Sequence, residues 1–407
     1  MNEFLPFKGI KVLEWTQAMT GTWSTRCLSD FGAEIIKIES TLFTDVTRLS
    51  LPFKDNIPGP DRSPLFTQAN TSKKSFTLDI KKPRGKEIFK KLVAWSDIVL
   101  QNQRPGLLKS LSLGYEELKK VKEDIIMIDV SIAGQEGPLV GHMGGWGSNS
   151  MAQSGQFYYY RFPEGDPLTP GFTATTDAIA PLFIGMTAIA ALDYKRREGK
   201  GQYIDICQLE SIVHFLGPFI LNYSVNKKIQ EPLGNRSPYA APHNAFRCKG
   251  NDKWCAISIS DESEWNAFCA VIGNPEWTKS PKFNTLSARK KNENELDDYV
   301  NKWTENYTHR EVMEKMQIAG VPAGMIQNAE EIVDLDPQIM DREFLIKLNH
   351  RVMGDYHLPS WPFKMSKTRP DIKMAPCLGE HNHYICTEIL GMSDEEFIDL
   401  VTAEIII

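Results

Sequence analysis

One acidic side chain, Asp177, stands at the start of an apolar stretch that runs from Ala178 to Leu192. Aspartate is a preferred N-cap residue because its side-chain oxygen accepts a backbone N–H of the first helical turn. A carboxylate in the same place can instead act as a nucleophile and form a covalent intermediate. The residue types therefore leave two interpretations open, a helix cap and a covalent catalyst, and the cap is the commoner use.

A second group of reactive side chains, Cys377, His381, His383 and Cys386, lies near the C-terminus. Thiolates and imidazoles are the ligands that zinc prefers. The spacing matches no zinc-finger pattern, and His381 to Cys386 lies where a C-terminal helix should begin. We therefore expect two of these side chains to face away from the others, and we predict no metal site.

The stretch from Ala178 to Leu192 is apolar on all sides, which predicts a helix buried in a protein core. The stretch is shorter than the about 20 residues that cross a bilayer, and it contains Pro181. We therefore predict no membrane span.

Composition excludes several classes of protein. The 407 residues are 42% hydrophobic and 24% charged, and the net charge of −6 is spread over the chain. A nucleic-acid partner is not expected, because no basic patch is evident. The first residues lack the pattern of a signal peptide, and the seven cysteines form no CxxC pair. We expect reduced thiols and a cytoplasmic protein.

Strand and helix patterns alternate over residues 1–135, which predicts a parallel sheet covered on both faces. No GxGxxG motif follows the first strand; the turn Thr16–Thr22 stands there instead and could present backbone amides. The expected strands are Gly9–Trp15, Ala33–Glu39, Thr77–Ile80, Asp97–Gln101 and Ile125–Ile132, and the expected helices are Trp23–Phe31 and Arg84–Trp95.

The pattern changes after residue 225. A strand pair, Ala245–Cys248 and Trp254–Ile259, is followed by amphipathic helix patterns at Glu262–Ile272 and Glu293–Glu305. These elements predict a smaller α+β domain over residues 225–330.

Motifs along nearly the whole chain resemble those of the class III CoA-transferases, which include formyl-CoA, carnitine and bile-acid CoA-transferases. They occur in the order of that family. The matching segments are Leu5–Thr16, Phe31–Ser40, Asp45–Arg48, Asn70–Lys81, Ser96–Asn102, Arg104–Gly106, Leu113–Tyr115, Gly134–Pro138, Ser154–Gly155, Asp177, Gly199–Asp205, Gly234–Arg236, Ala319–Pro322, Asp336–Gln338 and Leu378–His381.

This resemblance implies a fold and an assembly. We expect an α/β protein whose large Rossmann-like, parallel-sheet domain is built from both chain ends, plus a smaller α+β domain. The predicted boundaries are residues 1–215 for the first part of the large domain, 225–330 for the small domain, and 335–407 for the return to the large domain. Family members form interlocked dimers, so a homodimer is expected.

The resemblance also implies an activity. Asp177 falls on the catalytic aspartate of the family, which carries CoA from an acyl-CoA thioester to a free carboxylic acid through covalent aspartyl intermediates. Coenzyme A enters as the acyl-CoA co-substrate, and the scheme needs no metal. The expected partners are thus small molecules, an acyl-CoA and a carboxylic acid.

Further residues fall on positions that contact CoA in the family, or could meet its phosphates. They are Ala18, Met19, Thr20, Leu78, Lys81, Asn102, Arg104 and Lys109. Two arginines of the formyl-CoA branch are replaced here by Ser40 and Ser110, so the phosphates must be held differently. Met19 replaces a glutamine of that branch, which argues against formyl and oxalyl groups as substrates.

Two other functions stay open. The α-methylacyl-CoA racemases share the fold but pair the aspartate with a histidine, because moving a proton at the α-carbon needs an acid and a base. Trp146 stands at that position, although a shifted alignment would supply His142. A CoA-binding protein without catalysis is the third interpretation.

The aromatic run Phe157–Phe162 contains Arg161 and lies shortly before Asp177. It could line an acyl pocket for a bulky acid or for a dicarboxylate held by the arginine. The commoner alternative is a packed surface loop.

Overall fold

The computed structural model describes residues 4–141, 145–165 and 175–407. The contacts of the chain divide it into two compact units. The first unit takes its residues from the ranges 1–156, 169–228 and 339–407, and the second from 157–168 and 229–338. The domain boundaries expected at 215, 225, 330 and 335 stay predictions.

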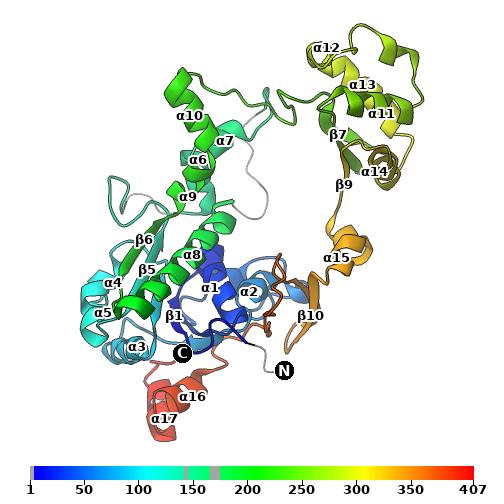
Figure 1. The fold of residues 1–407 in the computed structure, drawn as a ribbon. Coiled ribbons are helices and arrows are strands. Elements are labelled where there is room, and N and C mark those ends of the chain that lie inside the picture. The colour runs from blue at the N-terminus through cyan, green and yellow to red at the C-terminus, as the bar shows by residue number, and fades with distance from the viewer. Residues whose placement is uncertain (1–3, 142–144, 166–174) are drawn as a thin grey trace. The chain divides into compact units, whose positions relative to one another are not determined.

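A parallel sheet forms the centre of the first unit (Figure 1). Its six strands follow the order β3-β2-β1-β4-β5-β6. Their bounds are β1 Lys11–Trp15, β2 Glu34–Glu39, β3 Lys74–Thr77, β4 Ile98–Gln101, β5 Ile126–Ser131 and β6 Tyr203–Cys207. The predicted α/β class with a parallel sheet is therefore confirmed.

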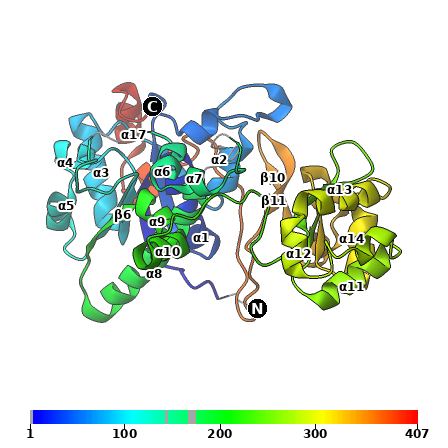
Figure 2. The ribbon, with the colours of Figure 1, turned by 90° about the horizontal axis from the view of Figure 1, so that it is seen from above.

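Apolar side chains alternate between the two faces of this sheet, and each face is covered by helices (Figures 1 and 2). On one face Val12 packs with residues of α1 (Ala18–Asp30) and α8 (Thr175–Glu198). On the other face Leu13 packs with residues of α3 (Pro83–Trp95) and with Ile405 and Ile406. Burial on both faces is typical of parallel sheets.

Helix α8 differs from the sequence-based expectation in length and in burial. It has 24 residues, begins at Thr175 and contains Pro181. Ile184 and Ala188 face the core, but Leu182 and Met186 are 66% and 59% exposed. The helix is therefore buried on one side only, because α1, α6 and α9 cover just that side.

With 24 residues, α8 is longer than the about 20 residues that cross a bilayer, so its length does not exclude a membrane span. Among the described residues α8 alone is long and apolar enough to cross a membrane, with a mean hydropathy of 1.5 over an 18-residue window and 33% of that window buried. The predicted absence of a membrane span stays a prediction.

Helix α1 also begins earlier than expected, at Ala18 instead of Trp23. The segment predicted as an open turn is consequently the first turn of α1, and only Thr16 and Gln17 connect it to β1. Ala18 has a φ of 57°, which turns the chain sharply into the helix.

The second unit is built around an antiparallel sheet with the order β7-β8-β9. Phe246 on β7 and Phe268 on α11 lie in its core. The strands are β7 His243–Arg247, β8 Trp254–Ser258 and β9 Ala323–Ile326, and the helices are α11 Glu262–Val271, α12 Leu286–Lys291, α13 Glu293–Thr304 and α14 His309–Ile318. The expected strand pair and both expected amphipathic helices are present.

The remaining α-helices and strands lie outside the two sheets described above. Seven belong to the first third of the chain or to the segment around α8: α2 Pro64–Ala69, α4 Leu107–Ser110, α5 Tyr115–Val121, α6 Gly147–Gln153, α7 Gln156–Tyr159, α9 Gln208–Phe215 and α10 Gly217–Asn226. The others are α15 Pro337–Asp341, the hairpin of β10 Leu345–His350 and β11 Gly354–Pro359, α16 Asn382–Tyr384 and α17 Asp394–Thr402.

Candidate active site

The order of the strands marks the place where a ligand would bind. From β1 the sheet continues to β2 and β3 on one side, and to β4, β5 and β6 on the other. In such sheets the crevice outside the carboxyl ends of the two central strands is the usual binding site. Here these ends are Trp15 on β1 and Gln101 on β4.

The loops that follow β1 and β4 are joined at this edge of the sheet. The backbone N–H of Gln17 donates to Oδ1 of Asn102 at 2.7 Å, and Nδ2 of Asn102 donates to the Gln17 carbonyl at 2.6 Å. A Cβ at Gly21 would lie 2.5 Å from Cβ of Thr16 and 2.8 Å from Nδ2 of Asn102. The close approach of the two loops therefore requires glycine at position 21.

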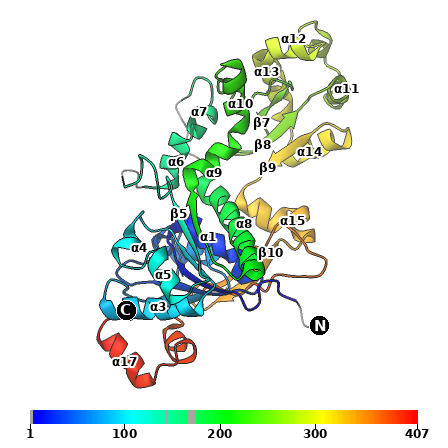
Figure 3. The ribbon, with the colours of Figure 1, turned by 60° about the vertical axis from the view of Figure 1, so that its left-hand side comes forward.

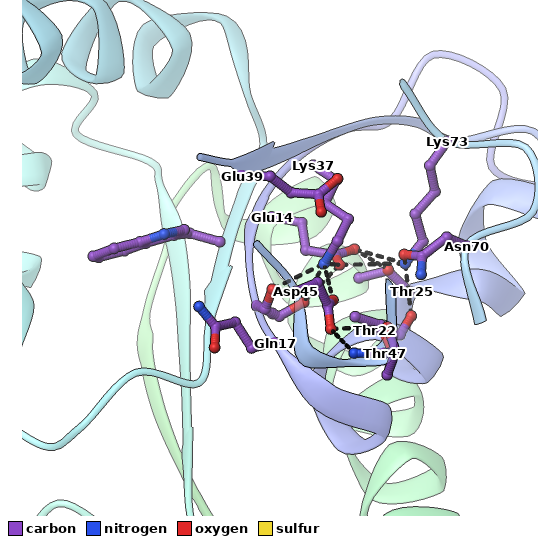
Figure 4. Close-up of polar contacts among 12 residues, drawn as sticks. Glu14, Gln17, Thr22, Thr25, Lys37, Glu39, Asp45, Thr47, Asn70 and Lys73 are labelled. Carbon is purple, nitrogen blue, oxygen red and sulfur yellow. Dashed lines mark hydrogen bonds and ion pairs between the residues drawn. The ribbon is translucent and has the colours of Figure 1, made fainter. Parts of the chain in front are cut away.

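Beneath the first turn of α1 lies a buried cluster of four charged side chains, Glu14, Lys37, Asp45 and Lys73 (Figure 4). Lys37 forms ion pairs with Asp45 at 2.9 Å and with Glu14 at 3.3 Å. Lys73 forms an ion pair with Glu14 at 2.9 Å. Two carboxylates face two ammonium groups, so the charges balance inside the unit.

The pKa values of this cluster reflect burial and pairing. Burial alone would raise the pKa of Glu14, but Lys73, Lys37 and two threonine hydroxyls bring it below its usual value. Burial lowers the pKa of Lys73 to about 8, against the opposing effect of Glu14. Burial likewise acts to lower the pKa of Lys37, but Asp45 and Glu14 raise it overall.

The same charged groups hold the backbone of the segment from Thr16 to Thr22. Lys37 donates to the Thr16 carbonyl at 2.8 Å, and Lys73 donates to the Thr22 carbonyl at 2.6 Å. Asp45 accepts from the backbone N–H of Ala18 at 3.1 Å. The segment is thus held at three points: at Thr16 before α1, at Ala18 where α1 begins, and at Thr22 after its first turn.

Asp177 lies in the first turn of α8, two residues inside the helix instead of at its cap. Oδ1 of Asp177 accepts a hydrogen bond from the hydroxyl of Thr20 on α1. α1 and α8 run side by side (Figures 1 and 3), which brings together two residues that are 157 positions apart.

Two opposing effects act on the pKa of Asp177. Burial raises the pKa above its usual value, and the Thr20 hydrogen bond lowers it. The helix N-terminus favours the charged form by about 0.3–1 kcal/mol. The carboxylate is thus partly desolvated but supported by one hydroxyl and by the helix.

The residues predicted to contact CoA take different places. Ala18, Met19 and Thr20 are in the first turn of α1, and Met19 is only 7% exposed. Leu78 is 2% exposed in the core, while the amide of Asn102 is used to join the two loops. Their contacts with CoA stay predictions.

The three predicted phosphate-binding cations, Lys81, Arg104 and Lys109, are exposed. Lys81 follows β3, and its ammonium lies 3.9 Å from the ring centre of Phe43. Arg104 follows β4, and Lys109 lies in α4. Among the described residues none of the three is part of an ion pair, so their charges are available to an anion.

Of the two positions considered for the histidine of a racemase, Trp146 and His142, the structure describes only the first. Trp146 is 65% exposed and precedes α6, whereas His142 lies outside the described residues. Within residues 4–141, 145–165 and 175–407, no histidine forms a hydrogen bond with Asp177.

The Cys/His group near the C-terminus is spread out. His381 accepts from the backbone N–H of Ser75 at 3.3 Å, and His383 contacts Asp394 at 2.8 Å. Cys386 is fully buried, and Cys377 lies 3.9 Å from His350. In the part of the chain that the structure describes, no three metal-ligating side chains converge.

The aromatic run Phe157–Phe162 belongs to the second unit. Arg161 donates to the carbonyl of Gly165 at 3.0 Å and lies over the ring of Tyr158. The hydroxyl of Tyr158 donates to Glu231 at 3.3 Å. The role of this aromatic run in substrate binding stays a prediction.

The buried charge cluster was not identified from the sequence. From the sequence, Glu14 and Lys37 belong to predicted apolar strands, and Asp45 and Lys73 stand out only as parts of the motifs shared with the family. The sequence does contain a pattern that indicates buried charges, because each of the first two strands carries a charged residue flanked by apolar ones. That pattern in a fully covered sheet requires a buried partner of opposite charge.

Known proteins resemble the chain over its whole length. Residues 7–382 match the family model of CoA-transferase family III. The succinyl-CoA–D-citramalate CoA-transferase of Chloroflexus aurantiacus is 32% identical over 98% of both chains. The human succinyl-CoA:glutarate CoA-transferase is 29% identical over 100% of this chain and 91% of its own length.

A solved structure agrees with these relatives. The crystal structure of a CAIB/BAIF family protein from Brucella suis superimposes with a TM-score of 0.86, at 27% identity over 95% of this chain and 100% of that one. The family match covers far more than half of the chain, and the relatives span it from end to end. The resemblance noted in the sequence is therefore confirmed: this chain belongs to CoA-transferase family III and is a CoA-transferase.

Proposed function

We propose that the protein transfers CoA from an acyl-CoA thioester to a free carboxylic acid by covalent catalysis on Asp177. The observation that supports this most is the setting of that carboxylate. It lies in the first turn of α8, partly desolvated, with one oxygen bound to the hydroxyl of Thr20. A desolvated carboxylate is a better nucleophile than a fully hydrated one, and the helix N-terminus keeps it ionised.

The first half of the reaction loads CoA onto the enzyme. A carboxylate oxygen of Asp177 attacks the thioester carbonyl carbon of the donor, the C–S bond breaks, and CoA leaves as a thiolate. The products are a mixed anhydride and free thiolate. The thiolate then attacks the carbonyl carbon of Asp177, the anhydride C–O bond breaks, and the donor acid leaves as a carboxylate. Asp177 is now a CoA thioester.

The second half reverses these steps with the acceptor. The acceptor carboxylate attacks the carbonyl carbon of Asp177 and expels the CoA thiolate, which gives a second anhydride. The thiolate attacks the acyl carbon of the acceptor, and the new acyl-CoA leaves together with a regenerated Asp177 carboxylate. No proton or electron is gained or lost, so the scheme balances without a metal or redox cofactor.

CoA itself would bind at the crevice between β1 and β4. We assign its contacts to Ala18, Met19 and Thr20 in the first turn of α1, to Asn102 in the adjoining loop, and to Leu78 after β3. Lys81, Arg104 and Lys109 would pair with its phosphates, since all three are exposed and carry no ion pair among the described residues.

The substrates are proposed to be dicarboxylic acids, with succinyl-CoA as the donor. The two curated relatives described above use succinyl-CoA with citramalate or glutarate, both of them dicarboxylates. A second carboxylate would need a cation, and Arg161 in the aromatic run is the residue that we proposed for it from the sequence. We also propose that the protein is a cytoplasmic homodimer.

The covalent intermediate can be tested directly. The protein is incubated with succinyl-, acetyl-, butyryl- or an aromatic acyl-CoA, digested, and searched by mass spectrometry for a CoA adduct or, after hydroxylamine, a hydroxamate on the peptide that contains Asp177. We expect the adduct with succinyl-CoA. No adduct with any donor, together with α-proton exchange from a branched acyl-CoA in heavy water, would replace this proposal with the racemase.

A further inference from the structure

The hydroxyl of Thr20 is placed where the chemistry on Asp177 develops charge. Thr20 is the third residue of α1 and is 2% exposed. Its hydroxyl donates to Oδ1 of Asp177, and this is the one side-chain hydrogen bond of Asp177 among the described residues. A hydroxyl can donate only one hydrogen bond, so Thr20 uses its single donor on Oδ1 of Asp177.

This contact distinguishes the two oxygens of the carboxylate. Oδ1 accepts the hydrogen bond from Thr20, whereas none of the described residues donates to Oδ2, which is therefore the oxygen that we assign to the attack. If Oδ2 attacks the donor thioester, Oδ2 becomes the bridging oxygen of the anhydride. Oδ1 then becomes the carbonyl oxygen of the aspartyl group. Thr20 therefore stays beside the carbonyl oxygen of both the anhydride and the CoA thioester.

The later steps place negative charge on that same oxygen. When CoA thiolate or the acceptor carboxylate attacks the carbonyl carbon of Asp177, the electron pair of the C=O bond moves onto Oδ1. A hydrogen-bond donor already aimed at the developing oxyanion is among the most effective contributions to catalysis. The hydroxyl of Thr20 occupies this place before the reaction begins.

The surrounding residues keep Thr20 from moving. Its own backbone carbonyl accepts a hydrogen bond from the hydroxyl of Ser24. On either side, Lys37 holds the carbonyl of Thr16 and Lys73 holds that of Thr22. These ammonium groups are themselves paired with Glu14 inside the unit. The donor is thus preorganised, and no reorganisation is needed as charge develops.

On this basis we infer that Thr20 is a second catalytic residue, which stabilises the oxyanion on Oδ1 whenever the carbonyl carbon of Asp177 is attacked. The inference rests on the proposed role of Asp177 as nucleophile. It assigns Thr20 a role beyond the CoA contact that the family resemblance implied, and it names Oδ2 as the attacking oxygen.

The test compares Thr20→Val, which keeps the shape and removes the hydroxyl, with Thr20→Ser, which keeps the hydroxyl. Rapid quenching and peptide mass spectrometry follow how fast the aspartyl-CoA thioester forms from succinyl-CoA and decays when acceptor is added. In Thr20→Val we expect the decay to slow by about 10²-fold, the usual effect of losing one oxyanion donor. Thr20→Ser should stay within about tenfold of the wild type.

A second readout separates catalysis from a structural effect. The Thr20 hydrogen bond stabilises the charged form of Asp177, so its loss should move the acid limb of the kcat/KM profile to higher pH. Thr20→Ser should leave that limb in place. Thr187→Val is the matched control, because among the described residues the hydroxyl of Thr187 on α8 hydrogen-bonds only to the carbonyls of Phe183 and Ile184. It should match the wild type in both measurements.

The outcomes are distinguishable. Absence of an Asp177 adduct in the wild-type protein would reject the proposed function, and the inference with it. An adduct that decays as fast in Thr20→Val as in the wild type would reject the inference alone. A raised KM for the acyl-CoA with unchanged kcat would also reject it and make Thr20 a CoA contact only.

Discussion

Asp177 combines two properties that conflict in most carboxylates, a low degree of hydration and a negative charge. Burial alone makes the charged form costly and raises the pKa. The hydroxyl of Thr20 and the N-terminus of α8 offset part of this cost. Because each contribution comes from a different element, the chemistry of this residue depends on how α1 and α8 pack.

Replacing the nucleophile should abolish transfer. Asp177→Ala removes the carboxylate, and Asp177→Asn replaces it with an amide that cannot form the anhydride. We expect kcat to fall by about 10⁴-fold or more, as for other covalent nucleophiles, measured as new acyl-CoA formed over time. Asp193→Asn is the control, since Asp193 lies on the same helix and, within the described part of the chain, forms ion pairs only with Arg196 and Arg197. One tenth of wild-type turnover in Asp177→Asn would disprove the assignment.

The pH dependence of catalysis should report the pKa of the same group. Asp177 must be ionised to attack, and burial raises its pKa above the usual 3.8. We therefore expect kcat/KM to fall, as the pH is lowered, at a higher pH than for a hydrated aspartate. A profile measured with enzyme that regains full activity at neutral pH checks this. An acid limb at or below the usual pKa would contradict it.

At the scale of elements, the first turn of α1 is fixed by residues of two strands and two loops. Glu14 comes from β1 and Lys37 from β2, where the two residues are direct partners in the register. Lys73 precedes β3, and Asp45 caps a short 3₁₀ helix that follows β2. A movement of any of these elements would change the position of Thr20 and so affect the site.

Breaking the buried cluster should cost stability. Glu14→Gln leaves Lys73 without its carboxylate partner, and removal of one member of a buried pair typically costs about 3–5 kcal/mol. We expect a decrease of that size in the free energy of unfolding, measured by urea denaturation. In Glu117→Gln the exposed pair with Lys120 is lost instead, which should cost at most about 1 kcal/mol. Equal effects of the two substitutions would show that the cluster contributes little.

The sequence predicted the elements better than their contacts. The apolar runs located β1, β2, β4 and β5, because strands buried on both faces are continuously apolar. The strand predicted at Thr77–Ile80 was misplaced, since β3 covers Lys74–Thr77 and shares only Thr77 with it. The pairing of Glu14 with Lys37 needs the register of β1 and β2, and the contact of Thr20 with Asp177 needs the packing of α1 on α8. Neither follows from local patterns. The exposed side of α8 was missed because its apolar residues continue all round the helix.

At the scale of the whole molecule, the first unit carries exposed apolar side chains on α8. Leu182, Met186 and Ile189 on α8 are 66%, 59% and 44% exposed. They border a cavity of about 570 Å³ that is also lined by Trp361 and Phe363. A contiguous apolar surface of this kind is typical of an interface, which fits the homodimer implied by the family.

The dimer can be tested through this surface. We expect sedimentation velocity to give twice the 46.1 kDa of one chain. Met186→Glu should shift the protein to monomer and lower its activity, because a charge in the interface would lose its hydration without gaining a partner. Ile398→Glu on α17 is the control, since Ile398 is also 59% exposed but lies outside this surface. A stable, active monomer in the wild type would refute the dimer.

One face of the parallel sheet is covered in part by Ile405 and Ile406, and this has a consequence for biosynthesis. Ile405 and Ile406 pack into the core together with Phe76, and Lys82 donates to the carbonyl of Ala403, 321 positions later. A ribosome that adds about 5–20 residues per second needs roughly 20–60 s to cover that distance. During this time the apolar face around Phe76 lacks the cover that Ile405 and Ile406 give it, and exposed apolar surface of this kind favours association of partly folded chains.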